Sequence, residues 1–185
     1  MTSEDLVVSV FDALAALGVP FMVSGSLASN FYGVPRATQD ADLVLDYKQL
    51  AVDALADRIE HLFDLDPQAG FEAVTGSLRL VARARSSAFD VELFGLTDDR
   101  HDLARFARRQ FVEVLGRTVA LPTAEDVVIN KLRWFKLARR RKDFEDARNV
   151  IAVQHATLDW SDVREWCRAM DLEQELVEAE KSLRG

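Results

Sequence analysis

Two aspartates separated by one residue, Asp40 and Asp42, stand just before a run of apolar residues. In a β-strand, side chains at positions i and i+2 project from the same face, so the two carboxylates would lie side by side. Each carboxylate would raise the pKa of the other unless a cation lies between them. Such oxygen ligands suit Mg²⁺ or Mn²⁺. The pair predicts a divalent-metal site, although an Asp-x-Asp pair by itself is also typical of a solvated strand edge.

A Gly-Ser pair, Gly25 and Ser26, precedes the two aspartates and follows a short apolar segment. The residues after it have the pattern of a short helix, and the N–H groups at the start of a helix can bind phosphate. Gly25 has no side chain to keep a ligand away from the backbone, and Ser26 adds a hydroxyl donor. Ser26 could equally serve as a helix N-cap, which is compatible with phosphate binding.

A third carboxylate is offered by Asp90 in the segment AFDVELF, residues 88–94. The alternation of this segment indicates a strand on which Asp90 and Glu92 share one face. If this strand lies beside the one that carries Asp40 and Asp42, Asp90 completes a set of three carboxylates, which can hold two metal ions. For Glu92 we favour a solvated strand position without a functional role.

The elements that must position these residues alternate between strands and helices. Apolar periodicity predicts helices over 4–17, 26–32, 47–62 and 98–109, a helical turn after Pro67, and strands over 21–25, 40–46, 77–84, 86–95 and on both sides of Gly116. From Thr123 onward the pattern is helical. We therefore expect an α/β (α+β) fold, with a core over 1–121 and a C-terminal helical region over 122–185 packed on it.

Composition limits the classes of protein to which this chain could belong. The single cysteine, Cys167, cannot form an internal disulfide, which fits a reducing compartment. The N-terminal segment carries acidic residues where a signal peptide needs basic ones. No run approaches the roughly 18 apolar residues of a membrane span. We expect a cytoplasmic protein without a membrane partner.

The charge of the chain is unevenly distributed. The net charge of −8 argues against indiscriminate binding to long nucleic acids. The segment KLRWFKLARRRK, residues 131–142, nevertheless holds seven basic residues and no acidic one. This run could bind a polyanion such as RNA, or it could be a solvated helix face whose basic end favours the helix dipole.

The order of these motifs resembles the nucleotidyltransferase superfamily that shares the DNA polymerase β core. Its pattern is Gly-Ser, a short helix, Asp-x-Asp and a later strand aspartate. The resemblance is closer to the toxin-like members, including the abortive-infection type. Those members carry an arginine four residues before the first aspartate, as Arg36 stands here, and two later segments that correspond to LPTAEDVVINKL (121–132) and RKDFEDA (141–147).

The resemblance implies a nucleotidyltransferase-fold mixed sheet with flanking helices and a C-terminal helical bundle. It implies transfer of a nucleoside monophosphate from an NTP to an acceptor, with Mg²⁺ or Mn²⁺ as cofactor. RNA, and tRNA in particular, is the expected acceptor in a toxin-like role, with a cognate antitoxin protein as a partner. One alternative is transfer to a small molecule or a protein side chain. Another is a catalytically silent module that binds a nucleotide or a partner.

The resemblance also implies roles for individual residues. The expected catalytic and metal-binding residues are Asp40, Asp42 and Asp90, and the expected nucleotide-binding residues are Gly25, Ser26, Arg36, Lys131 and Asp146. Structural alternatives remain for three of these. Arg36 could hold its loop by pairing with an aspartate, and Lys131 could be a surface lysine. Asp143 and Asp146, three residues apart on one helix face, could form salt bridges with nearby arginines.

Overall fold

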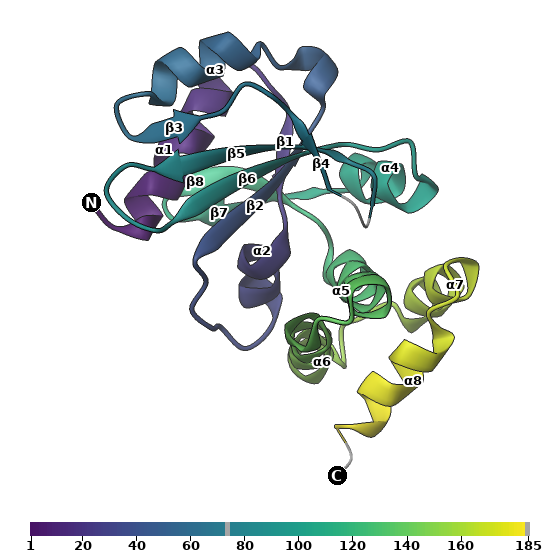
Figure 1. The fold of residues 1–185 in the computed structure, drawn as a ribbon. Coiled ribbons are helices and arrows are strands. Elements are labelled where there is room, and N and C mark those ends of the chain that lie inside the picture. Colours follow the sequence, from purple (N-terminus) through teal and green to yellow (C-terminus); the bar gives the residue numbers. More distant parts are fainter. Residues whose placement is uncertain (73–74, 184–185) are drawn as a thin grey trace.

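The computed structural model describes residues 1–72 and 75–183. Its elements follow the chain in the order α1 (Ser3–Ala16), β1 (Phe21–Val23), α2 (Gly25–Tyr32), β2 (Asp40–Leu45), the 3-10 helix η1 (Tyr47–Gln49), α3 (Val52–Ile59), β3 (Phe63–Leu65), β4 (Gly70–Phe71), β5 (Leu78–Ala84), β6 (Asp90–Gly95), α4 (Arg100–Ala107), β7 (Gln110–Val114), β8 (Arg117–Leu121), α5 (Ala124–Ala138), α6 (Arg141–Gln154), α7 (Trp160–Ala169) and α8 (Glu173–Lys181). A mixed sheet occupies the N-terminal part, and α5 to α8 gather beside it (Figure 1).

The sheet has the strand order β1-β2-β6-β5-β3, with β4 paired to β5. The central strands β2 and β6 are parallel, whereas β1 and β5 run antiparallel to them. The β2–β6 register places Asp40 opposite Asp90 and Asp42 opposite Glu92. Because paired residues of neighbouring strands project from the same face, all four carboxylates lie on one face of the sheet.

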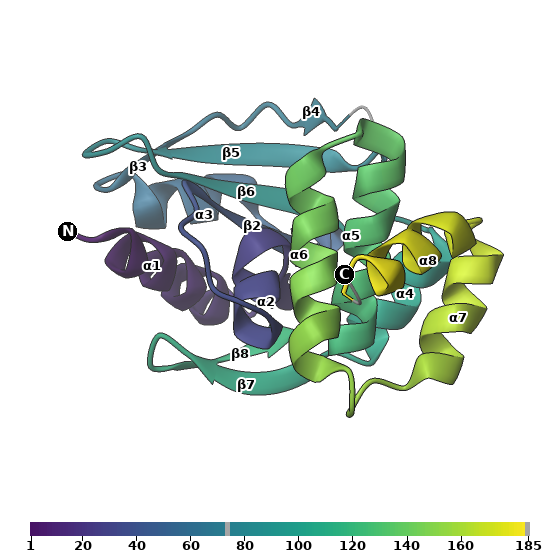
Figure 2. The same ribbon diagram turned by 90° about the horizontal axis from the view of Figure 1, so that it is seen from below.

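Helices cover the two faces of the sheet unequally. α1 and α3 lie over one face, where residues such as Leu14, Leu43 and Leu93 form the main core cluster. Alternation along the strands sends Val44 and Phe94 to the opposite face, together with the four carboxylates. On that side α2 packs against β2, α5 and α6 (Figure 2).

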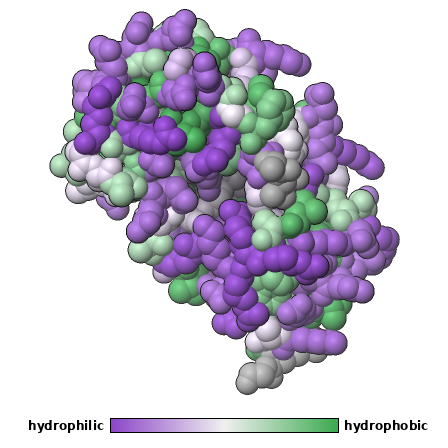
Figure 3. Space-filling model, viewed as in Figure 1, coloured by the Kyte–Doolittle hydropathy of each residue, from purple (hydrophilic) through white to green (hydrophobic). Residues whose placement is uncertain are grey.

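The C-terminal helices have an apolar cluster of their own. Leu132 of α5, Phe144 and Ile151 of α6 and Val163 of α7 are all nearly inaccessible to solvent. Ala28 of α2 joins this cluster, so α2 connects the sheet with the helical part. Hydrophilic side chains cover most of the face seen in Figure 3.

The mixed sheet with flanking helices that the sequence predicts is confirmed. The helical turn expected after Pro67 is wrong in part: Gly70 and Phe71 form the strand β4, which pairs with β5. Pairing with a neighbouring strand overrides the local preference there, and the rest of that prediction, at residues 73–74, lies outside the described residues. No helix in the described part of the chain is long and apolar enough to cross a bilayer.

Candidate active site

The sheet face that carries the carboxylates forms the floor of a cavity of about 240 Å³. The start of α2, the helix α4, and the facing parts of α5 and α6 complete its walls. Polar and charged side chains dominate the lining, which includes Ser26, Asp40, Asp42, Glu92 and Lys131. Residues from seven separate elements, α2, β2, β5, β6, α4, α5 and α6, therefore meet at one place, as expected for a ligand site.

Gly25 and Asp42 approach each other very closely at the bottom of this cavity. The N–H of Ser24, which precedes Gly25, donates a 2.8 Å hydrogen bond to the carbonyl of Asp42 and fixes the two segments together. Gly25 has φ +56°, a left-handed conformation that favours glycine. A β-carbon at Gly25 would lie 1.7 Å from Oδ2 of Asp42. Only glycine leaves room there for the carboxylate.

The pKa of Asp42 is strongly shifted by its surroundings. Burial, and then the negative charges of Asp40 and Glu92, raise its pKa to about 7. The charges of Lys131 and Lys142 counteract this rise only in part. Among the described residues, no basic side chain forms a direct ion pair with the Asp42 carboxylate.

Asp40 is held from one side by a threonine. Oγ1 of Thr38 donates a 2.7 Å hydrogen bond to Oδ1 of Asp40, which fixes the orientation of that carboxylate. Asp90 stands opposite Asp40 in the strand register, but it is not among the described residues that line the cavity. Glu92, for which the sequence favoured a solvated position, does line the cavity and pairs with Arg79.

The residues on the floor of the cavity fit a divalent cation in chemistry. A bound cation would lower the raised pKa of Asp42, because it favours the ionised carboxylate. Carboxylate oxygens are the ligands that Mg²⁺ and Mn²⁺ prefer. Within residues 1–72 and 75–183, no three His, Cys, Asp or Glu side chains already converge as a metal site.

A buried ion network lies behind Ser26. Nζ of Lys131, 5% exposed, donates to Oδ1 of Asp143 at 3.0 Å and lies 2.8 Å from Oδ2 of Asp146. Asp146 also accepts a two-pronged contact from Arg36, with Nε–Oδ1 2.8 Å and Nη2–Oδ2 2.9 Å. The same Nη2 of Arg36 donates to Oγ of Ser26 at 2.9 Å. The network therefore ties Ser26 to α5 and α6.

This network bears on three residues that the sequence assigns to nucleotide binding. Arg36 pairs with Asp146, which is the structural alternative considered for it. Burial alone would raise the pKa of Asp146, but the hydrogen bond from Arg36 and the charge of Lys131 lower it. Neither Arg36 nor Asp146 is among the described residues that line the cavity, whereas Lys131 is. Direct contact of Arg36 and Asp146 with a nucleotide stays a prediction. In the structure Asp146 holds Arg36, and Arg36 in turn positions the hydroxyl of Ser26.

Acidic partners engage most of the basic run 131–142. Besides Lys131, four of its residues pair with carboxylates: Arg133 with Asp99, Lys136 with Asp171, Arg140 with Asp143, and Arg141 with Glu145. Arg140 also stacks on Trp134, with its guanidinium 4.5 Å from the ring centre. Most of the basic side chains in this segment therefore have acidic partners, some from distant elements and some from the adjoining start of α6.

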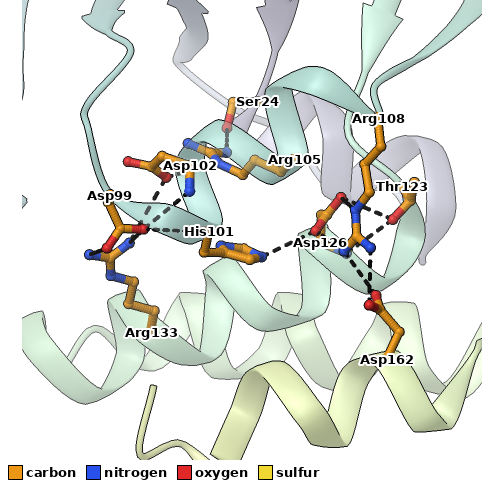
Figure 4. A network of polar contacts seen from close by, with 10 residues as sticks. All are labelled: Ser24, Asp99, His101, Asp102, Arg105, Arg108, Thr123, Asp126, Arg133 and Asp162. Carbon is orange, nitrogen blue, oxygen red and sulfur yellow. Dashed lines mark hydrogen bonds and ion pairs between the residues drawn. The ribbon is translucent and has the colours of Figure 1, made fainter. Parts of the chain in front are cut away.

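Arg105 of α4 is a cavity-lining cation that the sequence did not single out. It is 6% exposed, and its Nε donates to Oδ1 of Asp102 at 2.9 Å while Nη1 lies 3.5 Å from Oγ of Ser24 (Figure 4). No local signal distinguishes Arg105 from Arg100, the other arginine of α4, because the burial of Arg105 depends on neighbours distant in sequence such as Ser24.

The same close-up shows how α4 is fastened to the C-terminal helices. Nε2 of His101 lies 3.1 Å from Oδ1 of Asp126, and Nε of Arg108 donates to Oδ2 of Asp126 at 2.9 Å (Figure 4). Burial would raise the pKa of Asp126, but the hydrogen bonds from His101 and Arg108 lower it to about 2. Arg108 also contacts Asp162 of α7 at 3.0 Å. These contacts hold α4, a wall of the cavity, against α5 and α7.

The cavity brings together Gly25, Ser26, Asp40, Asp42 and Lys131 of the residues predicted from the sequence. A scan against models of protein families finds no match, and a search of curated proteins finds none either.

Solved structures do match this chain. ANT(2'')-Ia in complex with adenylyl-2''-tobramycin is 16% identical, with a TM-score of 0.61 over 92% of this chain and 98% of that one. An antigenic nucleotidyltransferase-like protein from Paracoccidioides brasiliensis is 20% identical, with a TM-score of 0.59 over 97% and 92%. The lincomycin-bound lincosamide antibiotic adenylyltransferase LnuA is 9% identical, with a TM-score of 0.51 over 83% and 98%. The chain has the nucleotidyltransferase fold.

Proposed function

We propose that this protein is a metal-dependent nucleotidyltransferase that moves a nucleoside monophosphate from an NTP to an acceptor hydroxyl. The observation that carries the proposal is the Asp42 carboxylate, seated against Gly25 at the bottom of a cavity that Asp40 and Glu92 also line. The raised pKa of Asp42 supports it, because a carboxylate held beside other negative charges costs stability when ionised and is retained most readily where a cation binds.

The proposed reaction breaks one phosphoanhydride bond and forms one phosphoester. The acceptor oxygen attacks the α-phosphorus, the bond to the bridging oxygen breaks, and pyrophosphate leaves. Asp40 and Asp42 would hold the divalent ions, which when bound neutralise the charge of the phosphates. Ser26 and the backbone at Gly25 would seat the triphosphate, with Arg36 orienting Ser26. Asp90 is the proposed base that accepts the proton of the acceptor hydroxyl.

Two classes of acceptor lead to different products. RNA is the acceptor that the basic run suggests, and an RNA product would favour the toxin-like role with a cognate antitoxin. Acidic partners at five of the seven basic side chains weaken that suggestion. The second class is a small hydroxylated molecule, and its support is the fold similarity to two antibiotic adenylyltransferases.

One experiment tests the reaction and the acceptor together. The protein is incubated with Mg²⁺ and each of the four α-labelled NTPs, with total tRNA, with a set of aminoglycosides and other polyhydroxylated compounds, or with cell protein. We expect label transfer in one mixture, matched by pyrophosphate release, and none with Asp42→Asn. NTP binding without pyrophosphate release in any mixture would instead favour the silent nucleotide-binding module.

A further inference from the structure

Five basic side chains line the cavity, and four of them already have a carboxylate partner. The partnered residues are Arg79 with Glu92, Arg105 with Asp102, Arg140 with Asp143, and Lys131 with both Asp143 and Asp146. A cation whose charge is matched within the protein has less to offer an incoming anion, because binding it means weakening the existing pair.

Lys142 is the exception among these five. It is the second residue of α6, exposed, and within the described ranges it has no carboxylate within 4 Å. It nevertheless lines the same cavity as Asp42. α6 packs against α2, so Lys142 and the Gly25–Ser26 turn border the same space.

Lys131, to which the sequence resemblance assigns the phosphate contact, is differently placed. Its ammonium group is buried and has two carboxylate acceptors, at 3.0 and 2.8 Å. Turning it toward a phosphate would leave Asp143 and Asp146, 1% and 3% exposed, without one of their cations. Buried carboxylates that lose a partner are strongly destabilising. The geometry therefore suits Lys131 to holding α5 and α6 together.

We propose that Lys142, rather than Lys131, contacts the β- and γ-phosphates of the bound nucleoside triphosphate. This inference rests on the proposed function and assigns one residue within it. A flexible, solvated lysine can follow the phosphates as pyrophosphate forms, and its full charge is available to them. The partnered cations around it hold the walls of the cavity in place.

Calorimetric titration with the four α,β-methylene nucleoside triphosphates, and separately with inorganic tripolyphosphate, tests the assignment in the presence of Mg²⁺. Lys142→Gln should weaken binding of both kinds of ligand by about tenfold, as expected for loss of a charged hydrogen bond. Added salt should reduce the difference from the parent. Lys142→Arg should retain most of the affinity. Arg141→Gln is the matched control, since Arg141 is adjacent, exposed and paired with Glu145.

The possible results separate this inference from the proposed function. Parent-like affinity of Lys142→Gln for the nucleotides would overturn the assignment while leaving the transferase proposal intact. A loss seen with nucleotides but not with tripolyphosphate would also overturn it, because the contact would not be with phosphate. If the parent protein bound none of these ligands, the proposed function and the assignment would fall together.

Discussion

The carboxylate of Asp42 occupies the space that a side chain at Gly25 would fill, with Oδ2 only 1.7 Å from the position of a β-carbon there. The relationship joins the start of α2 to the middle of β2 and makes the glycine a requirement of the site.

Gly25→Ala should abolish nucleotidyl transfer by displacing Asp42. Gly18→Ala is the matched control, because Gly18 also has a positive φ, +67°, but has nothing within 4 Å of its β-carbon position. Both variants should lose about 1 kcal/mol or more of stability to backbone strain, whereas only Gly25→Ala should lose activity. Melting temperatures and pyrophosphate release check this pair. Equal activities in the two variants would contradict a catalytic role for the close approach.

Asp42→Asn should stabilise the metal-free protein at pH 8 while abolishing activity. The folded state raises the pKa of Asp42 from 3.8 to about 7, so this acid binds its proton more tightly when folded. The stability of the parent should therefore fall as pH rises from about 4 to about 7. Asparagine carries no charge, so its advantage should grow between about pH 4 and pH 7 and reach its full size, about 1 kcal/mol or more, above pH 7. Urea denaturation at pH 4 and pH 8 measures it, and a large loss of stability at pH 8 would make the acidic pair structural.

Asp146→Ala should destabilise the fold by about 3–5 kcal/mol, because Arg36 and Lys131 would lose a buried partner. Glu145→Ala is its control one residue away. Glu145 is exposed and lies 3.6 Å from Arg141, and such surface pairs contribute about 0–1 kcal/mol. Chemical denaturation of both variants provides the comparison, and similar small losses would show that the network behind Ser26 is dispensable.

Asp90 and Glu92 should separate chemistry from ligand binding. Asp90→Asn should lower the rate of transfer by about 100-fold or more, as expected for loss of a general base, with little change in NTP affinity. Glu92→Gln should chiefly weaken Mg²⁺-dependent NTP binding, because Glu92 lies beside Asp42 and lines the cavity. Rate and affinity measured on both variants decide the roles. If Asp90→Asn kept full activity and Glu92→Gln had none, Glu92 rather than Asp90 would be assigned as the general base.

RNA binding, if RNA is the acceptor, should depend only weakly on salt. Of the seven basic residues in 131–142, Arg139 and Lys142 are the two without a carboxylate within 4 Å in the described part of the chain. Each phosphate contact adds about 0.7–0.9 to the slope of log affinity against log salt. We expect a slope of at most about 2, which Arg139→Gln should reduce further. A slope near 5, measured with tRNA between 50 and 200 mM salt, would mean that the paired arginines bind RNA after all.

Local patterns in the sequence determined much of the architecture and the floor of the site. Alternation along 40–46 and 86–95 predicts two strands, each with its carboxylates on one face, and the Gly25–Ser26 pair before a helix predicts that a ligand can approach the backbone there. These features are set by residues a few positions apart, because the periods of strands and helices belong to the backbone itself. The helical turn expected after Pro67 failed at Gly70 and Phe71, where pairing with β5 made a strand.

Tertiary structure decided the ion pairs that join distant parts of the chain. Arg36 meets Asp146 across 110 residues of sequence, and the run 131–142 finds acidic partners as far away as Asp171. The register of β2 with β6, rather than the alternation of either strand, brings Glu92 beside Asp42. Whether a cation is buried and paired, as Lys131 is, or free to meet a ligand, as Lys142 is, depends on how α2, α5 and α6 pack. Electrostatic partners are chosen by distance in space, and spacing along the chain does not fix that distance.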